Sequence, residues 1–198
     1  MTQAWRELGT IIMLQVQLKP LKEGTDHRVY KPHTALHPVD AFDLTKEGIT
    51  AVVDGQQVYD AHHMRHPLSR YRQSNPISIG LTSHYQRMQT RFGSHISLGI
   101  AGENIIVETE EVLFEDALMR GVAIQGEQGL IQLDGVFGIP PCKPFSKFCL
   151  NIPDERGEPE SVKETLQFLL KGTRGFCAEP VEVGTFTIRV GDKLWVPA

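Results

Sequence analysis

The sequence has few cysteines, no excess of basic residues and no long apolar run, and each shortage excludes a class of protein. Three cysteines in 198 residues are too few, and odd in number, for a disulfide framework, so a reducing compartment is expected. A formal net charge of -4 argues against nucleic-acid binding, which needs a basic excess. The apolar stretch 11–14 is too short to span a bilayer, and residues 1–9 lack the apolar run of a signal peptide. We therefore expect a cytoplasmic protein that binds neither nucleic acid nor a membrane.

What is present is the composition of an ordinary globular chain, with 40% hydrophobic and 22% charged residues. A chain of this length can bury a self-sufficient core without disulfides, and all-β barrels of this size are often undivided. The polar segment 151–160 carries prolines and a glycine. We interpret it as an internal connector, because the strand-like sequence after Gly172 needs partners upstream. The prediction is a single domain over residues 1–198.

Strand and turn patterns dominate the chain. Residues 14–18 alternate between apolar side chains and the glutamines Gln15 and Gln17, the period-two pattern of a half-buried strand. Three turn pairs able to take positive φ stand between β-prone segments: Asp54-Gly55, Asp134-Gly135 and Gly191-Asp192. Each pair predicts a hairpin. Several hairpins with little helix between them predict a barrel or a sandwich.

Two helices are predicted. The first follows the strand-like segment 77–81, has Thr82 or Ser83 as its cap, and carries on one face Tyr85, Met88 and Phe92. The second is signalled by a capping-box pattern of Ser161 and Glu164 and ends at Gly172. Its buried stripe comprises Val162, Leu166, Leu169 and Leu170.

Cys142 has the most distinctive setting of the three cysteines. Pro141 and Pro144 stiffen the backbone around it. The adjacent Lys143 is a cation of the kind found beside thiolates that attack sulfur or bind a soft metal. The alternative is that Cys142 is a small buried apolar residue, as free cysteines usually are. Cys149 and Cys177 have no such setting, and we expect both to be packed core residues.

Two glycine-bearing motifs could line a pocket. In the segment 99–106, two glycines stand beside Glu103 and Asn104, and an asparagine amide can read the edge of a heterocycle because it both donates and accepts. In the segment 172–176, Arg174 could present its planar fork to a phosphate or carboxylate. The alternatives are an ordinary turn with an exposed glutamate, and a turn arginine in solvent. If Arg174 does bind a ligand, we expect it to be exposed and to serve the ligand rather than the fold, so that its loss costs little stability.

The segment 60–66 contains three histidines. His62 and His66 are four residues apart, so a helix would place them on one face as a possible zinc pair, with His63 beside them. The glutamate that a zincin motif needs is missing, and Pro67 follows. The alternatives are a solvated loop, or a basic loop that holds an anion with the nearby residues Arg65, Arg70 and Arg72.

Taken in chain order, these motifs resemble the signature of the MOSC family, a domain associated with sulfur and the molybdenum cofactor. The similar elements are Gly102-Glu103-Asn104-Ile105, Pro141-Cys142, Arg174-Gly175-Phe176 and Val190-Gly191-Asp192-Lys193, and the segment 39–49 is similar to the family's opening strand and turn. The resemblance implies a mainly β chain, a closed β-barrel similar to the pyruvate kinase barrel domain with a few short helices. The length suits the small standalone members of the family.

The resemblance also implies a function. Family members bind the molybdenum cofactor (molybdopterin), relay sulfur or reduce N-hydroxylated compounds, and the family is associated with pyridoxal phosphate binding. Cys142 would be the catalytic residue and the metal ligand. The cofactor-binding residues would be Gly102, Glu103, Asn104, Lys143, Arg174 and Gly175. The substrate would be a small molecule or a sulfur donor, and a reductase would need a redox partner protein.

Such a site requires groups far apart in the sequence to meet. We expect Cys142, Asn104 and Arg174 to line one pocket, because an anionic pterin needs a thiolate, an amide and a guanidinium together. The basic stretch around His62 and Arg65 should lie near its mouth.

Two departures from the family pattern leave a second function open. Ile139 and Pro140 stand where the family often has a basic residue. The segments 54–55 and 60–63 only approximate the family's Gly-Asp-x-His element. The alternative is a non-catalytic ligand-binding β-barrel that has lost the cofactor.

Overall fold

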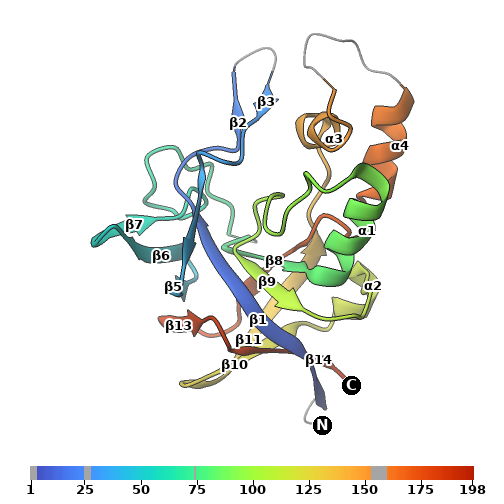
Figure 1. The fold of residues 1–198 in the computed structure, drawn as a ribbon. Helices are drawn as coiled ribbons and strands as arrows, with labels where there is room; N and C mark the ends of the chain where they lie inside the picture. Colours follow the sequence, from blue (N-terminus) through green and yellow to red (C-terminus); the bar gives the residue numbers. More distant parts are fainter. Residues whose placement is uncertain (1–3, 25–27, 74, 153–159) are drawn as a thin grey trace.

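In the computed structural model, which describes residues 4–24, 28–73, 75–152 and 160–198, seven strands form a closed mixed barrel (Figure 1). In ring order the strands are β1 (Trp5–Gln17), β14 (Lys193–Pro197), β10 (Val122–Gly126), β11 (Gly129–Gly138), β12 (Phe176–Pro180), β8 (Ile77–Leu81) and β9 (Ile105–Glu108). Pairing of β1 with β14 closes the ring. The neighbours β8 and β9 are parallel, and helix α1 (Thr82–Phe92) makes the crossover between them. The predicted closed β-barrel is confirmed.

Smaller elements surround the barrel. A second sheet has the order β13 (Phe186–Arg189), β5 (Ala41–Thr45), β6 (Gly48–Val53) and β7 (Gln56–Tyr59). Strand β4 (Leu36–Val39) pairs with the end of β1, and β2 (Lys22–Glu23) pairs with β3 (Val29–Tyr30). The remaining helices of the described chain are α2 (Glu115–Leu118), α3 (Lys143–Cys149) and α4 (Glu160–Phe168). Within the described ranges, no helix has the length and apolar character needed to cross a membrane.

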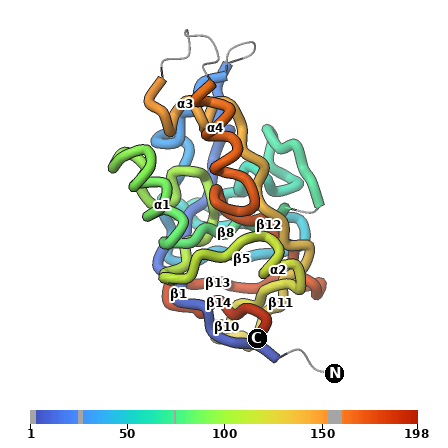
Figure 2. The backbone as a smooth tube through the Cα atoms, turned by 90° about the vertical axis from the view of Figure 1, so that its right-hand side faces the viewer, coloured from blue at the N-terminus to red at the C-terminus, as the bar shows by residue number. Residues whose placement is uncertain are grey.

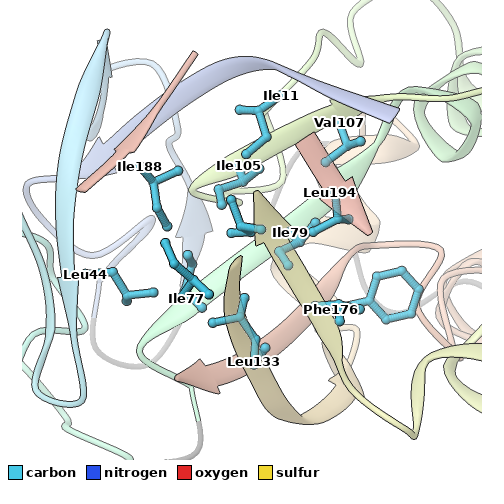
Figure 3. Close-up of a cluster of buried hydrophobic side chains, with 14 of the residues drawn as sticks. Ile11, Leu44, Ile77, Ile79, Ile105, Val107, Leu133, Phe176, Ile188 and Leu194 are labelled. Atoms are coloured by element: carbon cyan, nitrogen blue, oxygen red, sulfur yellow. The ribbon is translucent and has the colours of Figure 1, made fainter. Parts of the chain in front are cut away.

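Alternating apolar side chains fill the barrel. Ile77 and Ile79 of β8 point inward, as do Ile105 and Val107 of β9, and these side chains meet Leu133 of β11 in the core (Figure 3). The alternation follows from the strand period of two, which sends neighbouring side chains to opposite faces. Burying each such side chain contributes about 1.5–3 kcal/mol.

The outer face of β9 is covered as well. Ile106 belongs to a second apolar cluster, which it shares with Tyr85 and Met88 of α1 and with Phe145 of α3. A parallel strand buried on both faces needs an unbroken apolar run, which explains the sequence of residues 105–107. Figures 1 and 2 place α3 and α4 at one end of the barrel and strands β10 and β14 at the other.

One of the three predicted hairpins is confirmed. Strands β6 and β7 are joined by Asp54 and Gly55, which have φ values of 51° and 75°, and Val53 pairs with Gln56. Positive φ at both central residues is the geometry of the type I′ turn that suits antiparallel strands.

The other two hairpin predictions are wrong. Asp134 and Gly135 lie within β11, where the register against β12 shifts between Asp134 and Phe137. The dipeptide makes a bulge rather than a turn, and the chain reverses instead between Gly126 and Gly129. The turn at residues 191–192 joins β13 to β14, but these strands belong to different sheets and pair with other strands.

Both predicted helices form, with different ends and faces. Leu81 is the N-cap residue of α1, because the hydroxyls of Thr82 and Ser83 bond to the carbonyls of Thr109 and Glu111 instead. Along the second predicted stripe, Val162 and Leu169 are buried but Leu170 is exposed. The predicted cap Ser161 lies inside α4. Residues 153–159 of the predicted connector lie outside the described residues.

Candidate functional site

An open cavity of about 370 Å³ lies where the end of β1, the strand β2 region, the histidine-bearing segment after β7 and the turn before β12 meet. Its described lining residues include four cations, Lys22, Arg28, Arg70 and Arg174, together with His62, and no carboxylate. The chain as a whole carries a net charge of -4, so this concentration of one sign is local. Such a cavity favours an anionic ligand.

Arg174 is the fixed cation of this cavity. The turn after α4 buries it to 7% exposure. Its Nη1 donates to the carbonyl of Pro140 at 3.1 Å and its Nη2 to the carbonyl of Ala101 at 3.5 Å. The guanidinium carbon lies 4.9 Å from the centre of the Phe145 ring. Its Nε has no partner among the described residues, and a buried donor left unpaired calls for a ligand or water.

Cys142 meets Arg174 but does not line the cavity. Its Sγ lies 3.7 Å from Nη1 of Arg174, so a guanidinium N–H group can bond to the sulfur. The residue is partly exposed and stands directly before α3, whose Ser146 amide donates to the Cys142 carbonyl. Lys143 begins α3, is exposed and also lies outside the cavity lining. Arg174 therefore connects the two, because it lines the cavity and also contacts the Cys142 sulfur.

The other two cysteines are buried, as expected. Burial raises the pKa of both the Cys149 and the Cys177 thiol to about 12. Cys177 nevertheless contributes to the cavity wall from β12, a position that no local sequence signal indicates. Both remain neutral thiols near neutral pH.

Gly102 lines the cavity, and its backbone explains the choice of residue. Its φ is +97°, and an added Cβ would lie 2.4 Å from Cδ1 of Leu21. A larger residue would be strained and would also push into the cavity wall.

Asn104 does not line the cavity, contrary to expectation. Its Oδ1 accepts from the amide and the hydroxyl of Ser78 at 3.1 and 2.7 Å. Its Nδ2 donates to Asp60 Oδ2 at 3.0 Å and to the Gln15 carbonyl at 3.3 Å. Both polar atoms of the amide are occupied, so Asn104 holds three segments together and is not available to read a heterocycle.

Glu103 and Gly175 lie behind Arg174 and outside the cavity lining. Glu103 is 1% exposed, and burial raises its pKa to about 7 even though the hydroxyl of Tyr85 donates to its Oε2 at 2.6 Å. Gly175 has a φ of +115°, and an added Cβ would lie 2.8 Å from Cγ of Glu103. Close packing of the glycine on the glutamate positions the turn that carries Arg174.

The histidine-bearing segment is anchored by a buried carboxylate. Asp60 is 1% exposed. Its Oδ2 accepts from the backbone N–H of Gln17 at 2.7 Å and from Nδ2 of Asn104 at 3.0 Å. Its Oδ1 accepts from the backbone N–H and from the ring Nδ1–H of His62, both at 2.9 Å. Although burial alone would raise the pKa of Asp60, the bonds from His62 and Gln17 outweigh it and lower that pKa.

The three histidines do not form a zinc site. His63 Nδ1 accepts from the Arg65 amide, His66 Nδ1 accepts from the Leu68 amide, and His62 bonds to Asp60. Across the described part of the chain, no group of three or more potential metal-ligating side chains converges. His62 lines the cavity as expected, whereas Arg65 pairs with Glu47 and faces elsewhere.

Besides Cys177, the cavity is lined by polar residues that the sequence did not indicate as site residues, among them Lys22, Arg28 and Gln17. Lys22 begins β2 and Arg28 directly precedes β3, so both belong to a short hairpin that the alternation pattern did not predict. Gln17 was assigned to a half-buried strand, but it is buried together with Gln15, because the loop before β9 and the segment after β7 cover that face. Oε1 of Gln17 has no partner among the described residues and belongs to a cavity residue.

No family model matches the sequence, and no curated protein matches it. Solved structures match the fold. The YuaD protein of Bacillus subtilis is similar with a TM-score of 0.57 at 14% identity, covering 98% of each chain. A hypothetical protein gives 0.55 at 13% identity, covering 96% of this chain and 67% of its own. YiiM from Geobacillus stearothermophilus gives 0.50 at 19% identity, covering 96% and 74%. At these identities the likeness is one of fold.

Proposed function

We propose that the cavity binds a phosphate-bearing ligand, that this ligand is the molybdenum cofactor, and that Cys142 is the reactive sulfur of the site. One observation carries the proposal. The buried Arg174 lines a cavity whose described lining holds four cations and no carboxylate; its Nε has no partner among the described residues, and its Nη1 donates to the sulfur of Cys142. Arginine forks are the usual partners of phosphate groups in proteins.

The residues present suit the anionic part of that cofactor. Arg174, Lys22, Arg28 and Arg70 would hold its phosphate, and a cavity of about 370 Å³ falls within the range of about 300–1,000 Å³ that ligand sites occupy. When bound, the cofactor would supply a metal centre for redox or sulfur chemistry. Cys142 would supply the soft sulfur ligand that such a metal prefers.

The fold and the sequence motifs support the same family of functions. YiiM, a MOSC-domain protein, shares the fold of this chain, and the motifs that resemble MOSC domains include both Cys142 and Arg174. A reductase of N-hydroxylated compounds would need a redox partner protein, and a sulfur carrier would need a sulfur donor. Both partners stay predictions.

A second function is favoured by the position of the sulfur. Because Cys142 is not one of the residues lining the cavity, the chain could bind an anion there without using the thiol. That arrangement would make it a non-catalytic ligand-binding barrel.

Metal and pterin analysis separates the two functions. The protein and the variants Arg174→Ala and Cys142→Ser are purified from a molybdenum-replete host, with Arg189→Ala as control because Arg189 is exposed and lies on β13. The cofactor proposal expects molybdenum and pterin in the parent and the control, and loss of both in Arg174→Ala. Loss of molybdenum in Cys142→Ser would support sulfur ligation. Absence of both from the parent would favour the binding barrel.

A further inference from the structure

His62 is held at the cavity with one ring nitrogen engaged. Its Nδ1–H donates to Asp60 Oδ1 at 2.9 Å, and its side chain is 44% exposed, whereas that of Asp60 is 1% exposed. The other ring nitrogen, Nε2, has no hydrogen-bond partner among the described residues. Because His62 lines the cavity, Nε2 is the atom available to a ligand there.

The Asp60 carboxylate cannot turn away from His62. Its other oxygen accepts hydrogen bonds from the backbone N–H of Gln17 and from Nδ2 of Asn104. The Asp60 carbonyl accepts from the His63 amide, and the Ala61 amide donates to the Gln17 carbonyl at 2.6 Å. The segment is therefore fastened to the end of β1 through Asp60 and Ala61, directly before His62, and a carboxylate in this position fixes the tautomer and orientation of the imidazole.

Charges of both signs act on His62. Partial burial and the nearby cations Arg174 and Lys22 oppose its protonation, but the hydrogen bond and charge of Asp60 outweigh them and raise the pKa of His62 above its ordinary value. Arg28 and Arg70 line the same cavity, and its described lining contains no carboxylate. An anion placed among these groups would favour the charged imidazolium further.

Two unpartnered polar atoms indicate that a ligand belongs here. Nε of Arg174 and Oε1 of Gln17 are both buried, both belong to cavity residues, and neither has a partner among the described residues. One is a donor and the other an acceptor, so a ligand carrying an anionic group with a bound proton or hydroxyl would satisfy both.

We propose that His62 is a proton-exchanging ligand of the anion bound in this cavity, so that binding a phosphate group is coupled to uptake of a proton. The proposal rests on the anion site proposed above and adds the group that recognises the ligand's charge. On binding, Nε2 takes a proton from water and donates it in a hydrogen bond to a phosphate oxygen, while Nδ1–H stays on Asp60. On release the proton returns to water, so no oxidant or reductant is involved.

Calorimetry with inorganic pyrophosphate tests the coupling. Titrations near neutral pH in two buffers of different ionisation enthalpy give the number of protons taken up. The key variant is His62→Asn, whose Nδ2 can still donate to Asp60 but cannot titrate. His33→Asn is the control, because His33 is exposed and lies outside the cavity lining. Circular dichroism checks that each variant is folded.

Because pyrophosphate itself exchanges protons near neutral pH, the readout is the difference between the proteins: the parent and the control should take up a fraction of a proton more on binding than His62→Asn does. We expect the variant to bind pyrophosphate about tenfold more weakly at low pH, the effect of one charge-assisted hydrogen bond. The same proton exchange in His62→Asn as in the parent overturns the role of His62 and leaves the anion site standing. If the parent does not bind pyrophosphate, or Arg174→Ala binds it equally well, the anion site itself fails and this inference falls with it.

Discussion

Asn104 Nδ2 lies 3.0 Å from Asp60 Oδ2, which joins the glycine-bearing loop before β9 to the histidine-bearing segment after β7. The same amide accepts from Ser78 of β8. A barrel strand and two loops from different parts of the chain thus share one side chain. Asp60 in turn holds His62 at the cavity. Asn104, which the sequence suggested as a ligand-binding residue, therefore does not line the cavity but positions His62 there through Asp60.

Replacing Asn104 should therefore damage the fold more than a surface change. Asn104→Ala leaves Ser78 without an acceptor and removes a donor from the buried Asp60 carboxylate, at a cost of about 3 kcal/mol in the free energy of unfolding. Denaturation with urea measures the loss, with Gln57→Ala on the exposed face of β7 as control. A loss no larger than that of the control would show that the network adds little.

Cys142 should be alkylated before the other two cysteines. Burial raises the pKa of the Cys149 and Cys177 thiols to about 12, and thiols react as thiolates. Cys142 is the partly exposed thiol of the three. Mass spectrometry after limiting iodoacetamide gives the order of labelling. Preferential labelling of Cys177 through the cavity would redirect the proposed sulfur chemistry to that residue.

Arg174 should matter for both ligand and fold, which corrects the expectation of an exposed arginine. Arg174→Ala leaves the carbonyls of Pro140 and Ala101 without their donor and should cost about 2 kcal/mol of stability. Pyrophosphate binding should be lost as well. Arg174→Lys keeps the charge but lacks the fork, so it should recover part of the binding and little of the stability. Full stability in Arg174→Ala, measured by urea denaturation, would contradict the structural role.

The order of the sequence motifs predicted the closed barrel, but of the three residues expected to line one pocket, Cys142, Asn104 and Arg174, only Arg174 lines the cavity, and Cys142 contacts Arg174 from outside the lining. Local signals failed where the outcome depends on distant partners. Asp134-Gly135 fits a turn and a bulge equally well, and the choice depends on the register against β12. The partners of Asn104 lie 26 and 44 residues away. Lys22 and Arg28 line the cavity from the short hairpin of β2 and β3, whose pairing no local pattern predicts.

The pH dependence of stability should carry the signature of Glu103. Burial raises its pKa from an ordinary 4.5 to about 7, so folding favours the protonated acid. Below the pKa of Glu103 in the unfolded chain, this contribution to the free energy of unfolding is fully present. It is lost as the pH rises from there through the pKa of Glu103 in the folded protein. The loss between these two values should be about 3 kcal/mol.

Glu103→Gln keeps an acceptor for the Tyr85 hydroxyl and cannot ionise, so its stability should not fall over this interval in the way that the parent's does. The groups that both proteins share, including Asp60 and His62, titrate equally in each, and the difference between the two curves isolates Glu103. Urea denaturation at a series of pH values measures both curves. Glu108→Gln, which changes an exposed side chain on β9, should follow the parent. If Glu103→Gln follows it too, Glu103 is ionised in the folded protein at neutral pH. Its negative charge behind Arg174 would then offset part of the positive charge that the cavity presents to an anion.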